Sequence, residues 1–176
     1  MSSVEPNLGR AWERQIEVWN HTYRSDPKDV RAVVFRVPPP IRMIGSPVGG
    51  RFTAAFETFG PPDYSGVTAD YAVCFDAKAT TLQRWSFDLL DLHQARDLEG
   101  WSRMPRTKAF IALKIRDSSW VVDWSGFGPI WWRWNDERRL KRSEAWAASL
   151  TPARIREFGF TVARPMSTPG DWLSAL

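Results

Sequence analysis

The sequence contains little of what builds a disulfide, a zinc site or a membrane span. One cysteine and two histidines in 176 residues exclude an internal disulfide and a zinc-finger ligand set. A membrane-spanning helix needs about 20 consecutive apolar residues, and the wholly apolar runs here are far shorter. The first residues have neither the basic nor the apolar segment of a secretion signal. We therefore expect an intracellular, cytoplasmic protein with no membrane partner.

The composition is that of a packed, basic protein. A hydrophobic fraction of 43% with 11 tryptophans excludes a disordered polycation. Lys and Arg number 24 against 20 Asp and Glu, which gives a net charge of +4 and a pI near 9.6. This excess is a moderate argument for a polyanionic partner. The length suits one domain, so we expect a single domain over residues 1–176.

Hydrophobic periodicity predicts alternating helices and strands. Apolar residues at intervals of three and four predict a helix over 8–23, and β-branched residues predict a strand over 29–37. Further along, the patterns predict a long strand or strand pair over 64–78, a helix over 86–99 capped by Ser86, strands at 109–115 and 120–123, and a short helix opened by Thr151-Pro152. This order predicts an α/β fold, in which helices flank a sheet.

The segment 38–62 differs from the rest of the chain. It holds six of the 13 prolines and four glycines, yet it interleaves apolar residues such as Phe52. It is too apolar for a linker, and Gly49-Gly50 favours a tight turn. We therefore expect a hairpin-like arm that projects from the sheet.

Two carboxylates and a lysine form the most informative polar pattern. Asp63 follows a proline, and twelve residues separate it from the run Asp76-Ala77-Lys78. Residues i and i+2 of a strand face the same side, so Asp76 and Lys78 project together, and Asp63 enters from the preceding turn or strand. Carboxylates with room for water suit Mg²⁺ or Mn²⁺, and a lysine beside the ion can activate water or neutralise developing charge. The pattern, weak by itself, predicts metal-assisted hydrolysis of a phosphodiester.

Neighbouring motifs add to this pattern. They are, in order, Gly9-x-x-Trp12-Glu13-x-x-Ile16-x-x-x-Asn20-x-x-Tyr23, Pro38 to Ile44, Pro62-Asp63-Tyr64-Ser65-Gly66-Val67, Phe75-Asp76-Ala77-Lys78-Ala79-Thr80, and Ser86-Phe87-x-Leu89 leading to His93-Gln94. From about residue 9 to residue 123, this series resembles the RecU-type Holliday junction resolvases of the PD-(D/E)xK nuclease superfamily. The resemblance implies a restriction-endonuclease-like mixed central sheet, flanked by helices, with a protruding stalk.

The resemblance also implies a function and a set of site residues. It implies a homodimeric, Mg²⁺-dependent endonuclease, with Mn²⁺ as a substitute, that resolves four-way (Holliday) junctions by paired nicks in opposed strands. By position, Asp63, Asp76 and Gln94 would ligate the metal. Lys78 would activate water or stabilise the transition state, and Glu13 would support the site from its edge. The alternatives are a solvated helix acid for Glu13 and a capping role for Gln94.

The placement of charge favours a DNA ligand. Residues 101–116 include five basic residues and no acid, and Lys and Arg contacts to phosphates supply sequence-independent affinity. The candidate DNA-binding residues are Arg42, Arg51, Phe52, Arg103, Arg106 and Lys108. For the tryptophans, core packing is favoured over base stacking.

Two other functions stay open. The first is a nuclease of the same fold that acts on another DNA substrate, such as duplex ends or a specific sequence. The second is a non-catalytic DNA-binding protein that keeps the fold. The sequence is compatible with a cellular and with a phage-encoded protein.

Overall fold

The fold is given by a computed structural model, which describes residues 5–25, 27–56, 61–139, 149–159 and 162–176. A six-stranded sheet forms its centre, in the order β1-β4-β5-β7-β8-β10. The strands are β1 (Ala32–Arg36), β4 (Tyr64–Thr68), β5 (Ala72–Thr80), β7 (Thr107–Ile115), β8 (Ser118–Asp123) and β10 (Ala163–Pro165). Neighbours β5 and β7 run parallel, and the other neighbours run antiparallel. The sheet is therefore mixed, as predicted.

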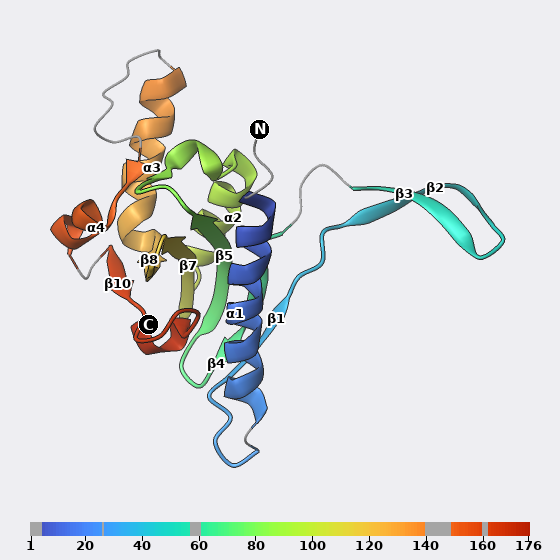
Figure 1. The fold of residues 1–176 in the computed structure, drawn as a ribbon, viewed down its shortest axis with the longest axis horizontal. Coiled ribbons are helices and arrows are strands. Elements are labelled where there is room, and N and C mark those ends of the chain that lie inside the picture. The colour runs from blue at the N-terminus through green and yellow to red at the C-terminus, as the bar shows by residue number, and fades with distance from the viewer. Residues whose placement is uncertain (1–4, 26, 57–60, 140–148, 160–161) are drawn as a thin grey trace.

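Helices cover both faces of the sheet (Figure 1). On one face, α1 (Glu5–Ser25) packs Trp12, Ile16 and Tyr23 against the apolar side chains of β5 and β7. On the other face, α2 (Leu92–Ser102) and α3 (Trp124–Arg139) pack a second buried cluster. The predicted fold class is confirmed, because two helical layers enclose a mixed sheet.

Smaller elements complete the chain. A two-stranded ladder joins β6 (Trp85–Ser86) to β9 (Ser149–Leu150), next to the 3₁₀ helix η1 (Phe87–Leu89). Helix α4 (Pro152–Phe158) begins as its Thr151-Pro152 signal predicts, with the Thr151 hydroxyl accepting from the Arg154 N–H. The 3₁₀ helix η3 (Trp172–Ala175) packs Trp172 under α1. Five tryptophans are fully buried, which confirms the prediction of a packing role for them.

One predicted helix boundary is wrong. The helix expected over 86–99 begins at Leu92, with Asp91 at the N-cap position, and it ends at Ser102. Ser86 lies instead in β6 and precedes η1. The Gln94 side chain explains the later start, because its Oε1 accepts the Asp91 N–H in a capping-box interaction.

The segment predicted as an arm forms a separate hairpin. Its strands are β2 (Ile41–Val48) and β3 (Arg51–Phe56), and they extend well away from the six-stranded sheet (Figure 1). Gly49 and Gly50 turn the chain with φ of 60° and 75°, a region that glycine adopts at little cost. Residues 57–60 of the predicted arm lie outside the described part of the chain.

No helix in the described ranges is both long enough and apolar enough to cross a bilayer.

Candidate active site

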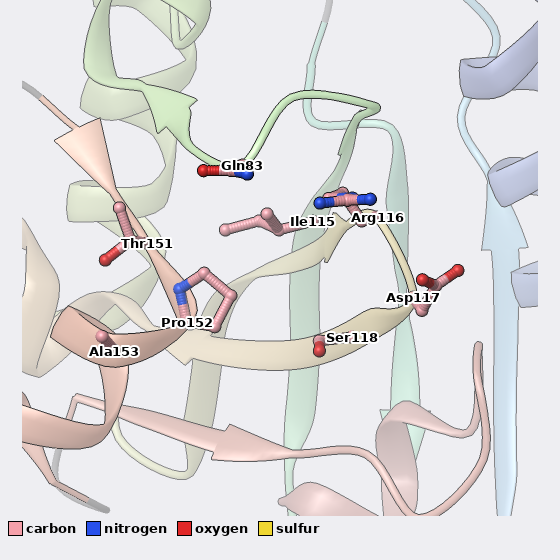
Figure 2. A pocket seen from close by; sticks show the side chains of 8 residues that line it. All are labelled: Gln83, Ile115, Arg116, Asp117, Ser118, Thr151, Pro152 and Ala153. Carbon is pink, nitrogen blue, oxygen red and sulfur yellow. The ribbon is translucent and has the colours of Figure 1, made fainter.

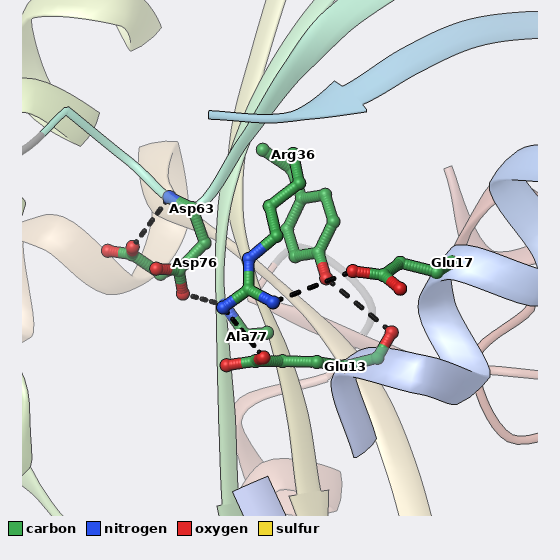
Figure 3. A network of polar contacts seen from close by, with 7 residues as sticks. Glu13, Glu17, Arg36, Asp63, Asp76 and Ala77 are labelled. Atoms are coloured by element: carbon green, nitrogen blue, oxygen red, sulfur yellow. Dashed lines mark hydrogen bonds and ion pairs between the residues drawn. The ribbon is translucent and has the colours of Figure 1, made fainter. Parts of the chain in front are cut away.

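Strand pairing brings the two predicted aspartates together. In the antiparallel β4–β5 ladder Tyr64 lies opposite Phe75, which places Asp63 beside Asp76. The Asp63 N–H donates to Asp76 Oδ1 at 3.2 Å, and the Ala77 N–H donates to Asp63 Oδ2 at 2.9 Å. Each carboxylate is thus oriented by the backbone next to the other (Figure 3).

Asp76 is a buried acid with an unsatisfied oxygen. Its side chain is fully buried, and its Oδ2 has no hydrogen-bond partner among the described residues. Burial raises the pKa of Asp76 to about 6, an effect that Lys78 opposes and the Asp63 carboxylate reinforces. A buried carboxylate of this kind is costly unless a cation compensates it.

Lys78 is held by Gln94 beside this pair. The Lys78 ammonium donates to Gln94 Oε1 at 2.9 Å, and Gln94 Nε2 donates to Asp76 Oδ1 at 3.4 Å. The same Oε1 also caps α2 by accepting the Asp91 N–H. Gln94 therefore links Lys78 both to the start of α2 and to Asp76. The predicted capping role of Gln94 is therefore observed together with its place in the site.

Glu13 reaches the site from α1 through an ion-pair network. Arg36, the last residue of β1, lies 2.8 Å from Glu13 and 3.6 Å from Glu17 (Figure 3). Burial raises the pKa of Glu13, and the Arg36 guanidinium opposes this while the Asp63 charge adds to it. The Tyr64 hydroxyl donates to the Glu13 carbonyl at 3.5 Å. Glu13 is therefore a partly buried, paired acid at the edge of the site.

Arg36 is the site residue that sequence reasoning missed. It ends an apolar strand just before the proline run, so nothing in the local pattern distinguishes it from a surface residue. Its place follows from the register of β1 against β4, which sets Arg36 opposite Tyr64 and next to Asp63, and no local sequence pattern gives that register.

The donor set is compatible with Mg²⁺. Within the described ranges, no three or more His, Cys, Asp or Glu side chains gather as a metal cluster. Mg²⁺ is commonly bound through only one or two carboxylates and several waters, completed by substrate phosphates. Asp63 and Asp76, with the unsatisfied Asp76 Oδ2, meet that requirement.

The predicted DNA-binding residues divide into two groups. Arg42, Arg51 and Phe52 are exposed on the hairpin. The hairpin starts at the site itself, because the Val37 N–H donates to the Asp63 carbonyl at 2.8 Å. The first group thus leads away from the aspartates along a projecting arm.

The second group lies at the other end of the β5–β7 pair from Lys78. Lys108 is opposite Val73, whereas Lys78 is opposite Leu113. Arg103 pairs with Glu99 at 2.8 Å, and Lys108 lies 3.9 Å from Asp123. The structure does not bring Arg103, Arg106 and Lys108 to the aspartates, and two of them already have acidic partners.

The chain is similar to several known proteins. The family model described as "Recombination protein U" (RecU) matches residues 7–150. Proteins named Holliday junction resolvase RecU, from Staphylococcus aureus strains JH9 and COL, are 27% identical over 177 residues, covering 96% of this chain and 79% of theirs. A solved structure of Hjc from Archaeoglobus fulgidus, titled a Holliday junction resolvase, aligns with a TM-score of 0.45 and 15% identity over 82% of this chain and 88% of that one.

Proposed function

Since this chain belongs to the RecU family, we propose that it is an endonuclease that resolves four-way DNA junctions by nicking two opposed strands. The curated relatives that it matches are named Holliday junction resolvases. One observation carries the proposal: Asp63, Asp76 and Lys78 meet at the end of the β4–β5 ladder, as the family resemblance predicts. That arrangement favours a nuclease over a protein that only binds DNA.

Asp63 and Asp76 would hold a divalent metal ion, with Mg²⁺ as the native ion and Mn²⁺ as a substitute. When bound, such an ion supplies an activated water and charge stabilisation for phosphodiester hydrolysis. The backbone N–H groups of Asp63 and Ala77 orient the two carboxylates before any ligand arrives. Gln94 completes the proposed ligand set, for which its Oε1 would exchange its hydrogen bond with Lys78 for the metal.

Lys78 would stabilise the negative charge that develops on the phosphate, or take part in activating the water. Its position on the same strand face as Asp76 directs the ammonium to the metal-holding carboxylates. In the absence of metal, the hydrogen bond that Lys78 donates to Gln94 Oε1 limits the conformations open to the flexible lysine side chain. This bond would hold the ammonium beside the carboxylates until Gln94 turns to the metal.

Glu13 would support the site from its edge, held there by Arg36. The guanidinium compensates the charges of Glu13 and Glu17 beside Asp63, where uncompensated acids would repel a phosphate. Arg36 is half exposed, so it can also face an incoming DNA backbone.

The active form would be a homodimer, because a four-way junction has two equivalent strands and paired nicks need two sites at a fixed separation. The exposed apolar and basic side chains of the hairpin, Arg42, Arg51 and Phe52 among them, would contact the junction. Arg103, Arg106 and Lys108 would contact duplex farther from the cleaved bond, given their place at the other end of the strands.

The test is cleavage of a synthetic four-way junction with Mg²⁺, beside a linear duplex of the same sequence. We expect symmetric paired nicks in the junction, little cleavage of the duplex, and loss of nicking in Asp63→Asn with binding retained. Equal cleavage of both substrates would instead support a nuclease for another DNA substrate. Junction binding without any metal-dependent nicking would show a non-catalytic member of the fold.

A further inference from the structure

A hollow of about 550 Å³ lies at the end of the central strands, beyond Lys78. Three segments form it: the loop after β5, the β7–β8 turn and the start of α4 (Figure 2). The lining residues are Gln83, Ile115, Arg116, Asp117, Ser118, Thr151, Pro152 and Ala153. None of them belongs to the site described above.

The hollow is tied to the strand that carries the site. The Arg116 N–H donates to the Thr80 carbonyl at 2.9 Å, and Ile115 lies opposite Thr80 in the β5–β7 ladder. Asp76, Lys78 and Thr80 are every second residue of β5, so they lie on one face of the strand, with Thr80 about 7 Å beyond Lys78. Ile115 packs in the buried cluster of that same face. Thr80 itself is buried under the loop that follows β5, so the hollow opens at the end of the strand, close to Lys78, and not along the face between them.

The lining chemistry suits an anion attached to an apolar body. The Arg116 guanidinium is exposed, and no described residue pairs with it or accepts a hydrogen bond from it. Hydroxyl donors at Ser118 and Thr151 lie across the hollow, with Ile115 and Pro152 as an apolar wall. Arginine is the side chain best suited to a phosphate, which it can bind through two parallel N–H groups. Asp117 is the one acid of the lining, and Figure 2 shows its carboxylate on the far side of the turn from Thr151.

We propose that this hollow binds one nucleotide of the cleaved DNA strand, with its phosphate on Arg116 and its sugar or base against Ile115 and Pro152. The inference rests on the nuclease function proposed above. The volume is in the range of sites that hold ligands of nucleotide size. Arg116 bonds the backbone of Thr80, two residues beyond Lys78 on β5, so Lys78 and Arg116 are close enough for neighbouring nucleotides of one strand to engage both. The hollow would thus fix the register of the strand relative to the scissile bond.

Binding measurements test the role of Arg116 directly. The backbone of Arg116 has φ of 53°, so Arg116→Gly removes the guanidinium without straining the turn. In an Asp63→Asn background, which prevents cleavage, we expect Arg116→Gly to weaken junction binding about tenfold and to reduce the slope of log K against log salt by about 1. Arg116→Lys should retain much of the affinity.

Arg24→Gln is the matched control. It removes one positive charge from the last turn of α1, which covers the opposite face of the sheet. It should leave both the affinity and the salt slope unchanged. If Arg116→Gly behaves like Arg24→Gln, the inference is overturned.

A second measurement locates the phosphate. Neutral methylphosphonate linkages are placed at successive positions on either side of the cleaved bond. At one position we expect the neutral linkage to lower the junction affinity of the protein that keeps Arg116. At the same position it should not lower the affinity of the Arg116→Gly variant any further. Additive effects at every position would contradict a contact between Arg116 and a defined phosphate.

Free thymidine monophosphate distinguishes a DNA strand from a separate nucleotide ligand. Micromolar binding of the mononucleotide that depends on Arg116 and does not compete with junction DNA would overturn the assignment to the cleaved strand. The inference and the proposed function fail separately. A chain that binds and nicks the junction without using Arg116 overturns only the inference, whereas failure of the wild-type chain to nick any junction overturns the proposed function.

Discussion

The backbone N–H of Val37 donates a 2.8 Å hydrogen bond to the carbonyl oxygen of Asp63. Val37 begins the segment that leads into the hairpin, and Asp63 follows the segment that leads out of it. The two ends of the arm are therefore joined to each other at a residue of the candidate site. A movement of the arm would therefore act on the position of the Asp63 carboxylate through this backbone hydrogen bond.

Val37→Pro should break the hydrogen bond between the base of the arm and Asp63. Proline removes the N–H, and the extended backbone of β1 before it tolerates a following proline. We expect junction nicking to slow by about tenfold, because Asp63 is a proposed metal ligand and a small displacement of such a group is costly to catalysis. Val37→Ala keeps the N–H and is the control. Single-turnover rates at saturating protein measure the effect, and equal rates for the two variants would contradict it.

Asp76→Asn should stabilise the metal-free protein while abolishing its activity. The buried Asp76 carboxylate has an oxygen without a partner, so removing its charge relieves a desolvation cost. We expect the free energy of unfolding without metal to rise by about 1 kcal/mol, as at other sites where function opposes stability. Urea unfolding in the presence of a chelator measures it. Asp63→Asn, at a less buried position, should gain less, and a loss of stability in Asp76→Asn would contradict the explanation.

Glu99 should make stability depend on pH. Its carboxylate accepts from the Trp124 and Trp132 indoles at 2.9 and 3.1 Å. Burial acts to raise the pKa of Glu99, but these hydrogen bonds and Arg103 lower it overall. A depressed pKa in the folded state means that the contribution is present above the ordinary glutamate pKa and is lost as the pH falls through the folded value.

Glu99→Gln tests this contribution. At pH 7 we expect the variant to be less stable by about 1–2 kcal/mol, the usual worth of hydrogen bonds to a charged group. The difference from wild type should shrink as the pH falls below the ordinary glutamate pKa and then through the lower folded value, because Glu99 is then protonated in the folded state as well. Urea midpoints at pH 7 and at successively lower pH measure the change. A difference that does not vary with pH would show that the charge is unimportant.

Gly66→Ala should disrupt the pairing of β1 with β4. A Cβ at position 66 would lie 2.1 Å from the Val33 carbonyl oxygen and 2.6 Å from the Val34 Cα, and backbone atoms cannot easily move away. We expect a loss of about 3 kcal/mol or more in the free energy of unfolding. Gly100→Ala in α2 is the control, since its Cβ meets nothing within 4 Å, and there alanine should stabilise the helix. Similar behaviour of the two variants would rule out the clash.

The aspartates and Lys78 were predictable because period-two alternation alone determines which side of a strand a residue faces. The pairing of Asp63 with Asp76 then follows from a short turn between two strands. Gln94 lies beside Asp76 and Lys78, and its role as a metal ligand stays a prediction. The helix that carries Gln94 begins at Leu92, six residues later than the predicted start at Ser86. The capping interaction at Asp91 determines where the helix starts, and several other polar residues in this region were equally plausible N-caps from the sequence.

Features that depend on distant pairing were not predictable. The role of Arg36 requires the register of β1 against β4 and the position of α1, neither of which a local pattern contains. Likewise, the five basic residues within 101–116, with no acid among them, favoured a DNA ligand. In the structure, Glu99 lies one helical turn before Arg103 and pairs with it, so composition overstated the free charge there.

The closed base of the arm has a topological consequence. Strands β1 and β4 are antiparallel neighbours, so the arm is an insertion at the tip of an ordinary β-hairpin. A sheet of this order would close with a tight turn in place of residues 38–62, and neither buried cluster includes any residue of this segment that the structure describes. Under the proposed function, the arm that would contact the junction and the sheet that would carry the cleavage chemistry are therefore separable parts of one chain. New branched substrates could be reached by changing the insertion while the sheet that carries the chemistry stays constant.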